Sequence, residues 1–286
     1  MSSITRVGIV GSGLMGSGIA EVCARGGVDV LVCEADVSAS AAGRARIERS
    51  LARSVRAGRI SERAHDDAVA RLGYTTDLDT FADRHLVIEA VAEDEQVKAE
   101  VFGRLDKVVA AREAILASNT SSIPITRIAA ATARPHRVIG LHFFNPVPVL
   151  QLVEVVPSLF TDRDTQERTA EFATTVLGKS VVTTGDRAGF VVNALLIPYL
   201  LAAVRMCEAQ FATPEDIDRG MVLGCAHPLG PLALADLIGL DTVAAVAASM
   251  YAEFKEPLYA APPLLLRMVE AGLLGRKSGR GFHEYP

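Results

Sequence analysis

A glycine pattern near the start of the chain has the spacing of a phosphate-binding turn. Gly11, Gly13 and Gly16 match GxGxxG, with Leu14 and Met15 between the last two glycines. In such a turn the first glycine allows a tight bend, the second lets a pyrophosphate approach, and the third lets the helix pack on the strand. Phosphates would bind at the N-terminus of the following helix, where free amides and the helix dipole favour anions. The pattern predicts a dinucleotide site formed by these five residues.

An acidic residue further along the chain indicates which dinucleotide would bind. Glu34 follows the glycines by about twenty residues and ends a second apolar run, residues 28–33. A carboxylate there accepts hydrogen bonds from the adenosine ribose hydroxyls and repels a 2′-phosphate, and neither Cys33 nor Ala35 is basic. This context favours NAD over NADP. The alternative is that Glu34 is a solvent-facing acid at a strand end.

One histidine and one glutamate each lie in a context that suits proton-transfer chemistry. His142 follows the apolar run 137–141, which places it at the carboxyl end of a predicted strand, where open α/β sheets bind ligands. Imidazole titrates near neutral pH and can accept a hydroxyl proton as a hydride leaves. Glu154 lies in the apolar run 152–156, and a carboxylate buried there needs a partner. The alternatives are a structural histidine and a glutamate on the open face of a strand.

An arginine-rich segment stands out between residues 44 and 63. Its arginines are Arg44, Arg46, Arg49, Arg53, Arg56, Arg59 and Arg63. Ile47, Leu51 and Val55 recur every four residues and would form the buried stripe of a helix. Another face of this helix would carry arginines that recur at threes and fours, namely Arg46, Arg49, Arg53 and Arg56. Guanidinium groups bind phosphates through forked donors, so this face suits an anionic partner such as coenzyme A. The alternative is an ordinary solvated helix face.

The elements that would position these residues alternate between strands and helices. The predicted buried strands are residues 7–10, 28–33, 86–90, 114–117, 137–141 and 181–183. This alternation predicts an α/β fold whose N-terminal domain, residues 1–185, is a Rossmann-type doubly wound sheet. Beyond residue 185 the pattern becomes helical, with helices expected over residues 190–210, 214–223, 232–254 and 264–271. Residues 186–286 are therefore predicted to form a smaller all-helical domain.

Composition narrows the classes of function. The 286 residues carry a net charge of -5, which argues against a general nucleic-acid binder. The start of the chain lacks a signal-peptide pattern, and the longest apolar stretch, residues 191–204, is too short for a membrane span.

The four cysteines lack CxxC spacing, so we expect reduced core thiols in a cytoplasmic protein and no metal site. The alternative is a metal or redox site. These cysteines are Cys23, Cys33, Cys207 and Cys225.

Longer motifs, in a fixed order, extend almost from one end of the chain to the other. They are EAVAED (89–94), SNTSS (118–122), GLHFFNPVP (140–148), GFVVN (189–193), HPLGP (227–231) and GRKSGRGF (275–282). Through these motifs the chain resembles the 3-hydroxyacyl-CoA dehydrogenase family and is especially similar to its bacterial 3-hydroxybutyryl-CoA dehydrogenases. The resemblance implies an NAD-dependent enzyme that interconverts a short (S)-3-hydroxyacyl-CoA and its 3-oxoacyl-CoA.

The resemblance also implies roles for single residues. His142 would be the catalytic base and Glu154 its partner, while Ser121 and Asn193 would bind the substrate's oxygens. The cofactor contacts that it implies, in addition to Glu34, are Glu93, Lys98, Ser121, Asn145 and Lys277. At Glu93 the register is open by one residue, because Asp94 is adjacent.

For coenzyme A the resemblance implies Ser50 and a cation about two helical turns later. That later position falls near Ala57, so the lysine of the family is not matched, and Arg53 or Arg56 would substitute for it. The family usually dimerises through its helical domain, which makes residues 190–204 the candidate interface. Two other functions stay open: a dehydrogenase of a free hydroxy acid, and a non-catalytic, crystallin-like NAD-binding protein.

Overall fold

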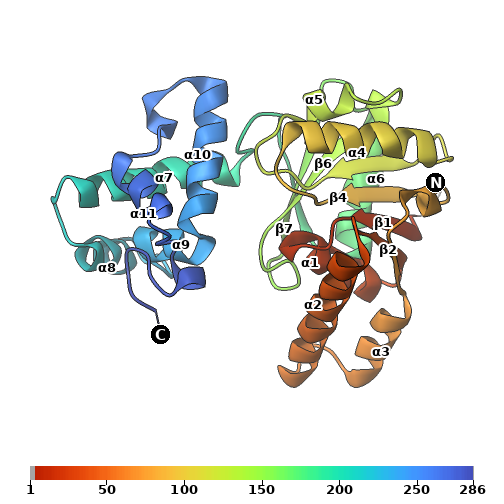
Figure 1. Ribbon diagram of the computed structural model, residues 1–286, viewed down its shortest axis with the longest axis horizontal. Helices are drawn as coiled ribbons and strands as arrows, with labels where there is room; N and C mark the ends of the chain where they lie inside the picture. Colours follow the sequence, from red (N-terminus) through yellow and green to blue (C-terminus); the bar gives the residue numbers. More distant parts are fainter. Residues whose placement is uncertain (1–3, 286) are drawn as a thin grey trace. The chain divides into compact units, whose positions relative to one another are not determined.

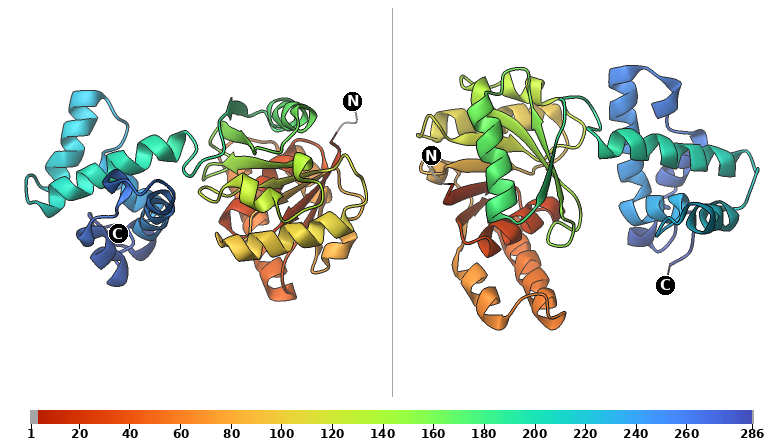
Figure 2. Two further views of the ribbon diagram at one scale, coloured as in Figure 1. Left: turned by 90° about the horizontal axis from the view of Figure 1, so that it is seen from above. Right: turned by 180° about the vertical axis from the view of Figure 1, so that it is seen from behind.

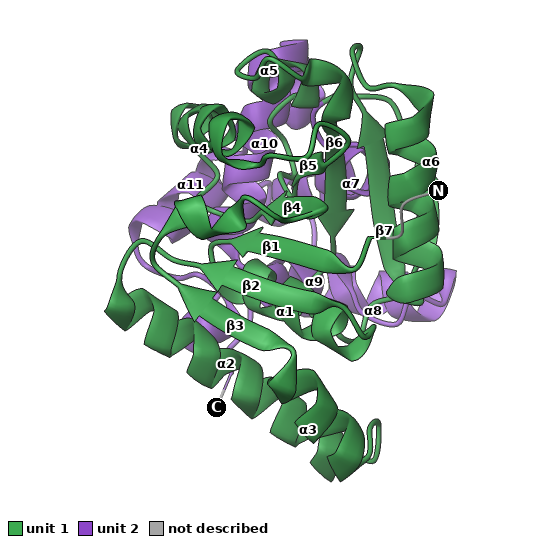
Figure 3. Ribbon diagram, turned by 90° about the vertical axis from the view of Figure 1, so that its right-hand side faces the viewer, with its two compact units in different colours: residues 1–187 green, residues 188–286 purple. Residues whose placement is uncertain are grey.

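The chain divides into two compact units, with the division between Arg187 and Ala188 (Figure 1; Figure 3). The computed structural model describes residues 4–285. The first unit is built on a sheet, and the second is formed by helices. The boundary predicted after residue 185 lies two residues before this division.

The first unit contains one eight-stranded sheet with the order β3-β2-β1-β4-β5-β6-β7-β8. Its strands are β1 (Arg6–Val10), β2 (Asp29–Cys33), β3 (Leu72–Thr75), β4 (Leu86–Glu89), β5 (Ile115–Ser118), β6 (Val138–Phe143), β7 (Leu152–Pro157) and β8 (Ser180–Thr183). The first six strands are parallel and have the 3-2-1-4-5-6 order of a doubly wound dinucleotide-binding fold. The predicted Rossmann-type fold is therefore confirmed.

Two strands of the sheet were not predicted. β3 is a half-buried edge strand of the sequence LGYT, whose glycine and mixed polarity hide the usual alternation. β7 covers the apolar run around Glu154 and pairs antiparallel with β6. A sequence that alternates strands and helices favours parallel pairing, because parallel strands need a crossover. The connection between β6 and β7 is instead short and contains no crossover helix. The two strands therefore pair antiparallel, with Glu154 directly opposite His142.

Helices cover both faces of this sheet. They are α1 (Leu14–Arg25), α2 (Val37–Arg56), α3 (Glu62–Ala70), α4 (Glu95–Val108), α5 (Ile125–Ala129) and α6 (Arg163–Glu171). α4 and α6 lie on opposite faces, and α2 with α3 forms a helical hairpin that extends beyond the sheet (Figure 2). The helix expected through Arg63 therefore ends earlier, at Arg56, and a turn containing Gly58 (φ +67°) separates it from α3.

Strand alternation decides which side chains face the site. Alternate residues of the strands, such as Ile88, Ala117 and Leu141, enter the apolar cluster that includes α1. Side chains of successive strand residues point to opposite faces of a sheet. The next residue of each strand, among them Glu89 and His142, consequently points to the other face. Both polar residues lie at or next to the carboxyl end of their strand.

The second unit contains helices α7 (Val192–Glu208), α8 (Pro214–Cys225), α9 (Pro231–Ile238), α10 (Leu240–Phe254) and α11 (Pro263–Glu270). The single helix expected over 232–254 was wrong, since α9 and α10 meet at Gly239 with a bend of 95°. Gly239 has a φ of +102°, a conformation that residues with a side chain rarely adopt. In the described part of the chain no single helix is long and apolar enough to cross a membrane, although the bent pair α9–α10 passes that test together.

Candidate active site

His142 and Glu154 form a buried pair across two antiparallel strands. They occupy opposed positions of β6 and β7, and opposed residues of such a pair share one face of the sheet. His142 Nδ1 lies 2.7 Å from Glu154 Oε2, with the two residues 6% and 0% exposed. The Phe144 ring contacts the imidazole edge-on at a centroid distance of 4.6 Å. A carboxylate at Nδ1 fixes the orientation of the ring and stabilises its protonated form.

The glycine-rich turn joins β1 to α1 as the sequence predicts. Gly11 has a φ of +88°, and a Cβ at Gly16 would lie 1.9 Å from the Gly11 carbonyl oxygen. A Cβ at Gly13 would meet nothing within 4 Å, and Gly13 is the N-cap of α1 without a side-chain cap. Met15 packs against the core while Leu14 is exposed. The turn thus leaves open space beside the first amides of a helix, which is the geometry of an anion site.

Glu34 lies against this turn, directly after β2. Its carboxylate accepts hydrogen bonds from the amide of Ser12 and, at 2.8 Å, from the Ser12 hydroxyl. The amide of Ala35 donates to its other oxygen at 3.2 Å. The structure therefore brings Glu34 and the glycines together at the carboxyl ends of β1 and β2.

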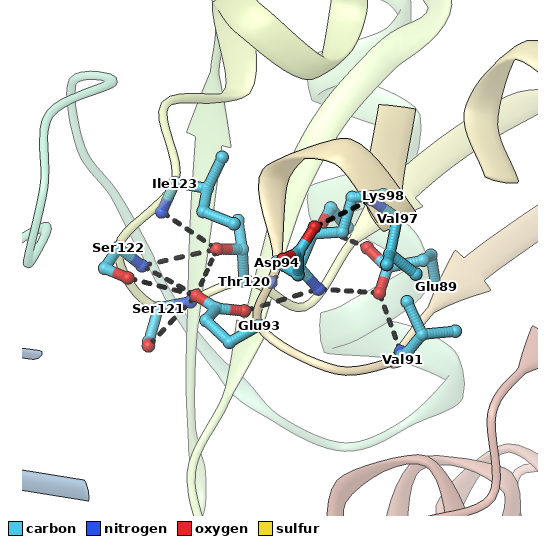
Figure 4. A network of polar contacts seen from close by, with 11 residues as sticks. Glu89, Val91, Glu93, Asp94, Val97, Lys98, Thr120, Ser121, Ser122 and Ile123 are labelled. Atoms are coloured by element: carbon cyan, nitrogen blue, oxygen red, sulfur yellow. Dashed lines mark hydrogen bonds and ion pairs between the residues drawn. The ribbon is translucent and has the colours of Figure 1, made fainter. Parts of the chain in front are cut away.

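A second polar cluster joins the loops that follow β4 and β5 (Figure 4). Glu93 Oε1 accepts hydrogen bonds from the Thr120 hydroxyl (2.5 Å), the Ser121 amide (3.0 Å) and the Ser122 amide (3.2 Å). Lys98 Nζ lies 3.3 Å from Glu93 Oε2. Burial alone would raise the pKa of Glu93, but the Lys98 ammonium and these hydrogen bonds outweigh it and hold the pKa below its ordinary value.

The neighbouring acid, Asp94, has a different contact. Asp94 is the N-cap of α4, and its side chain accepts a hydrogen bond from the amide of Val97 at 2.9 Å. Glu93, rather than Asp94, contacts Ser121. Of the two adjacent acids, Glu93 is therefore the one that lies beside the SNTSS loop (118–122).

Lys98, one of the predicted cofactor contacts, is almost fully enclosed. Its side chain is 1% exposed, and its ammonium donates to Glu89 Oε1 at 2.7 Å. Glu89 itself is fully buried at the end of β4. The sequence analysis did not predict a role for Glu89. It is the last residue of an apolar strand, and its hydrogen-bond partners come from other segments.

The loop between β6 and β7 carries Asn145, which is exposed. A buried lysine supports the loop: Lys179 Nζ donates to the carbonyl oxygens of Val147 (2.6 Å) and Leu150 (2.7 Å). Burial lowers the pKa of this ammonium. At the start of the loop, Asn119 Oδ1 accepts a hydrogen bond from the Phe143 amide at 2.9 Å. Neither Lys179 nor Asn119 was among the predicted site residues.

Only part of the predicted arginine face is exposed. Ser50 is half-buried on α2, and Arg53 and Arg56 are exposed in its last turns. Arg46 instead turns inward, where its guanidinium donates to the Ser12 carbonyl oxygen at 2.6 Å. Placing Arg46 with the anion-binding face was therefore wrong, because it braces the glycine turn. Arg59 lies in the turn after α2 rather than on the helix.

The two remaining predicted residues belong to the second unit. Asn193 is the second residue of α7 and is half-buried. Lys277 donates to both carboxylate oxygens of Asp241, each at 2.5 Å.

The cysteines were only partly predicted. Cys23 and Cys33 are buried core thiols, and burial raises the pKa of Cys23 to about 12. Cys225 is exposed, so its assignment to the core was wrong. It is the last residue of the amphipathic helix α8, where the neighbouring apolar residue Leu223 is also exposed. Among residues 4–285 no group of three or more His, Cys, Asp or Glu residues could hold a metal ion.

Two sequence profiles together cover nearly the whole chain. The NAD-binding domain of 3-hydroxyacyl-CoA dehydrogenase matches residues 6–187, and the C-terminal domain of the same enzyme matches residues 189–285. The chain belongs to the 3-hydroxyacyl-CoA dehydrogenase family. Membership confirms the resemblance expected from the motifs, and with it the NAD-binding character of the first unit.

Named members of the 3-hydroxyacyl-CoA dehydrogenase family match over their full length. A 3-hydroxybutyryl-CoA dehydrogenase of Mycobacterium tuberculosis is 62% identical over 283 residues, which cover 99% of each chain. The crystal structure of M. tuberculosis FadB2 has a TM-score of 0.98 and 62% identity, covering 100% of both chains. That of (S)-3-hydroxybutyryl-CoA dehydrogenase from Ralstonia eutropha has a TM-score of 0.93 at 44% identity, covering 99% of this chain and 100% of that one.

Proposed function

We propose that this chain is an NAD-dependent dehydrogenase that interconverts (S)-3-hydroxybutyryl-CoA and acetoacetyl-CoA. The observation that carries the proposal is the buried His142–Glu154 pair at 2.7 Å, in a unit that also holds a phosphate-binding turn. Both lie toward the edge of the sheet that is formed by the carboxyl ends of its parallel strands, where doubly wound sheets bind ligands. The names of the close relatives supply the substrate class.

The residues of the turn fit NAD. Gly13 leaves space beside the uncapped first turn of α1, and Glu34 offers carboxylate oxygens to the ribose hydroxyls. We assign the cofactor contacts to Gly11, Gly13, Leu14, Met15, Gly16, Glu34, Glu93, Lys98, Ser121, Asn145 and Lys277. When bound, NAD supplies the acceptor for the hydride that leaves carbon 3 of the substrate.

His142 is the proposed general base. Its Nδ1 contacts Glu154, so Nε2 takes the proton of the 3-hydroxyl as the hydride leaves. Glu154 stabilises the imidazolium that forms and keeps the ring oriented. Ser121 and Asn193 hold the 3-oxygen and the thioester carbonyl, where charge develops. In the reverse direction His142 returns the proton to the 3-oxygen.

The coenzyme A part of the substrate is assigned to α2. Ser50, Arg53 and Arg56 lie in its second half, and two exposed guanidinium groups there suit phosphate oxygens. An enzyme of free hydroxy acids would need no such cations. We therefore favour the CoA-linked substrate over the free acid.

Assembly and location are further parts of the proposal. We propose a homodimer formed through the helices of the second unit, where Leu195 of α7 is 73% exposed. The unpaired core thiols Cys23 and Cys33 suit the reducing cytoplasm. No nucleic acid or membrane partner is proposed.

The test compares cofactors and substrates on the purified protein. The decrease in NADH absorbance is followed with acetoacetyl-CoA and with free acetoacetate, and each assay is repeated with NADPH. We expect turnover with NADH and acetoacetyl-CoA to exceed that of the other three combinations by at least about tenfold. Free acetoacetate lacks the phosphates that α2 would bind, and Glu34 repels the 2′-phosphate of NADPH. Turnover of free acetoacetate alone would identify a free hydroxy-acid dehydrogenase. No turnover with any combination would favour the non-catalytic protein.

A further inference from the structure

Glu89 is the fully buried acid of the cluster in Figure 4, and the proposed chemistry gives it no role. It is fully buried at the carboxyl end of β4. A carboxylate removed from water in this way is costly unless donors surround it. The groups that contact the Glu89 carboxylate therefore indicate its role.

Three donors from separate segments meet at the Glu89 carboxylate. Oε1 accepts hydrogen bonds from the Val91 amide and from Lys98 Nζ, each at 2.7 Å. Oε2 accepts from the Ser118 hydroxyl at 2.7 Å. Glu89 and Ser118 are register partners on β4 and β5, so their side chains share one face of the sheet. Glu89 thus links the strand ends to the first turns of α4.

One route from Glu89 to the proposed site passes through Lys98. The ammonium lies between two carboxylates, 2.7 Å from Glu89 Oε1 and 3.3 Å from Glu93 Oε2. Glu93 in turn accepts hydrogen bonds from the Ser121 amide and hydroxyl. The position of Lys98 fixes one oxygen of Glu93, and Glu93 fixes Ser121.

The second route passes through Ser118. Its hydroxyl donates to Glu89 and also accepts a hydrogen bond from the Thr120 amide at 3.2 Å. The Thr120 hydroxyl donates to Glu93 at 2.5 Å. The loop of residues 118–122 is therefore tied to Glu89 at its start and, through Glu93 and Lys98, at its end.

We propose that Glu89 is a positioning residue for the dehydrogenase reaction, because it holds Lys98 and Ser118 so that Glu93 and Ser121 keep their places. The inference rests on the proposed function, which assigns Ser121 to the substrate and cofactor site. Glu89 itself contacts no reactant. It acts through the two routes that converge on the 118–122 loop.

The carboxylate form of Glu89 is what the arrangement needs. All three groups that meet it are donors, and a carboxylate offers acceptor sites on both oxygens. A glutamine of the same shape would present an amide NH₂ to a hydroxyl or ammonium donor. It would also leave the Lys98 charge with Glu93 alone, which favours movement of Glu93 toward Lys98 and away from Ser121.

The test is Glu89→Gln, with Glu100→Gln as the matched control. Glu100 is an exposed acid on α4, so its change alters the same chemical group outside the cluster. At saturating NADH and acetoacetyl-CoA, Glu89→Gln is expected to lower kcat about 10- to 100-fold, because small displacements of positioned groups have effects of this size. Glu100→Gln is expected to stay within about twofold of the unchanged protein. Circular dichroism and urea unfolding establish the folded fraction to which kcat is referred.

A merely structural role would lower the urea midpoint but leave kcat of the folded protein unchanged, and that result would overturn the inference. A double-variant cycle tests the route through Lys98: in a Lys98→Met background, Glu89→Gln should lower kcat by a smaller factor than in the unchanged protein, because only the route through Ser118 is left to break. Full additivity of the two changes would contradict that route.

If Glu89→Gln does not fold, Ser118→Ala replaces it and should lower kcat about tenfold. An unchanged kcat of Ser118→Ala would overturn the inference. A lack of turnover by the unchanged protein would instead overturn the proposed function, and this inference with it.

Discussion

At the scale of single residues, the His142–Glu154 pair depends on a fully buried carboxylate. Glu154 is fully buried within an apolar strand, and His142 lies against its carboxylate and stabilises its charge. The same enclosure makes the pair sensitive to the loss of one charge. An amide at position 154 would keep the shape but would no longer stabilise an imidazolium.

Glu154→Gln is therefore expected to lower kcat for NADH-dependent reduction of acetoacetyl-CoA by about 10²- to 10⁴-fold, the range of general acid–base contributions. Steady-state absorbance assays at saturating substrates measure the change. Glu167→Gln, an exposed acid on α6, is the control. Retention of full activity by Glu154→Gln would show that the pair has only a structural role.

Glu21 provides a pH-dependent prediction. It is fully buried on α1, and its nearest ion-pair partner, Arg25, is 3.6 Å away. Burial raises the pKa of Glu21 above 4.5, although Ser50, Arg25 and Arg53 partly oppose the shift. Because the folded pKa is the higher one, ionised Glu21 destabilises the fold above that pKa, and stability recovers as the pH falls toward 4.5.

Glu21→Gln should therefore stabilise the protein by about 1 kcal/mol near pH 8, and the gain should shrink as the pH approaches 4.5. Urea unfolding of both proteins at pH 8 and at pH 5 measures the difference. The exposed acid Glu62 on α3 supplies the control, Glu62→Gln. A gain that grows at low pH would have the opposite sign and would refute this explanation.

Single residues were predicted from the sequence where their signal is local. Gly11, Gly13 and Gly16 lie within one turn, and Glu34 follows at a fixed distance, so the motif itself carries the information. Glu89 and Lys179 give no such signal, because their partners lie on other segments and meet them only in the folded sheet. Arg46 shows the same limit, since helical periodicity alone cannot indicate that it reaches Ser12.

At the scale of elements, the site depends on how α2 packs against the glycine turn. A Cβ at Gly43 of α2 would lie 1.8 Å from the Ser12 hydroxyl and 2.6 Å from the Ser12 Cβ. That hydroxyl donates to Glu34. The close approach of the helix thus sets the position of the proposed ribose-binding carboxylate.

Gly43→Ala is expected to weaken NADH binding about tenfold, because overpacking of this contact displaces Ser12 and Glu34 together. Fluorescence titration of NADH measures the Kd. Gly103→Ala is the matched control, since its Cβ would meet only Ala131 at an ordinary 3.5 Å. An unchanged Kd for Gly43→Ala would mean that the turn adjusts without moving Glu34.

Element types were predicted well and their pairing less well. The apolar runs of β1, β2, β4, β5 and β6 identify buried strands, because such runs are typical of parallel sheets. The antiparallel return of β7 depends on a short connection, which the alternating pattern hides. Gly239 similarly divides one apolar helical pattern into α9 and α10, and a single glycine does not signal a break.

At the scale of the whole molecule, the proposed assembly concerns the second unit. Its core is formed by residues of α7, α8, α9, α10 and α11, while Leu195 of α7 stays exposed. Exposed apolar side chains on a helix that also contributes to a core are common at subunit interfaces. The family resemblance, together with the apolar stretch 190–204, had indicated this surface.

Leu195→Glu is expected to raise the dimer dissociation constant by about tenfold or more, because a charge would be desolvated at the interface. Sedimentation velocity at micromolar protein measures the shift from dimer to monomer. Leu159→Glu, at an 89% exposed position of the first unit, is the control. A monomer for the unchanged protein would contradict the proposed dimer.

In the proposed reaction His142 transfers the proton while NADH reduces a CoA-linked ketone. The most direct measurement is single-turnover loss of NADH absorbance with acetoacetyl-CoA, comparing the unchanged protein with His142→Ala and with His136→Ala. His136 is exposed, so its replacement controls for loss of a histidine. Rapid turnover by the unchanged protein and by His136→Ala, with a rate at least about 10²-fold lower for His142→Ala, is the predicted result. Equal rates for all three proteins, or no reaction in any of them, would contradict the account.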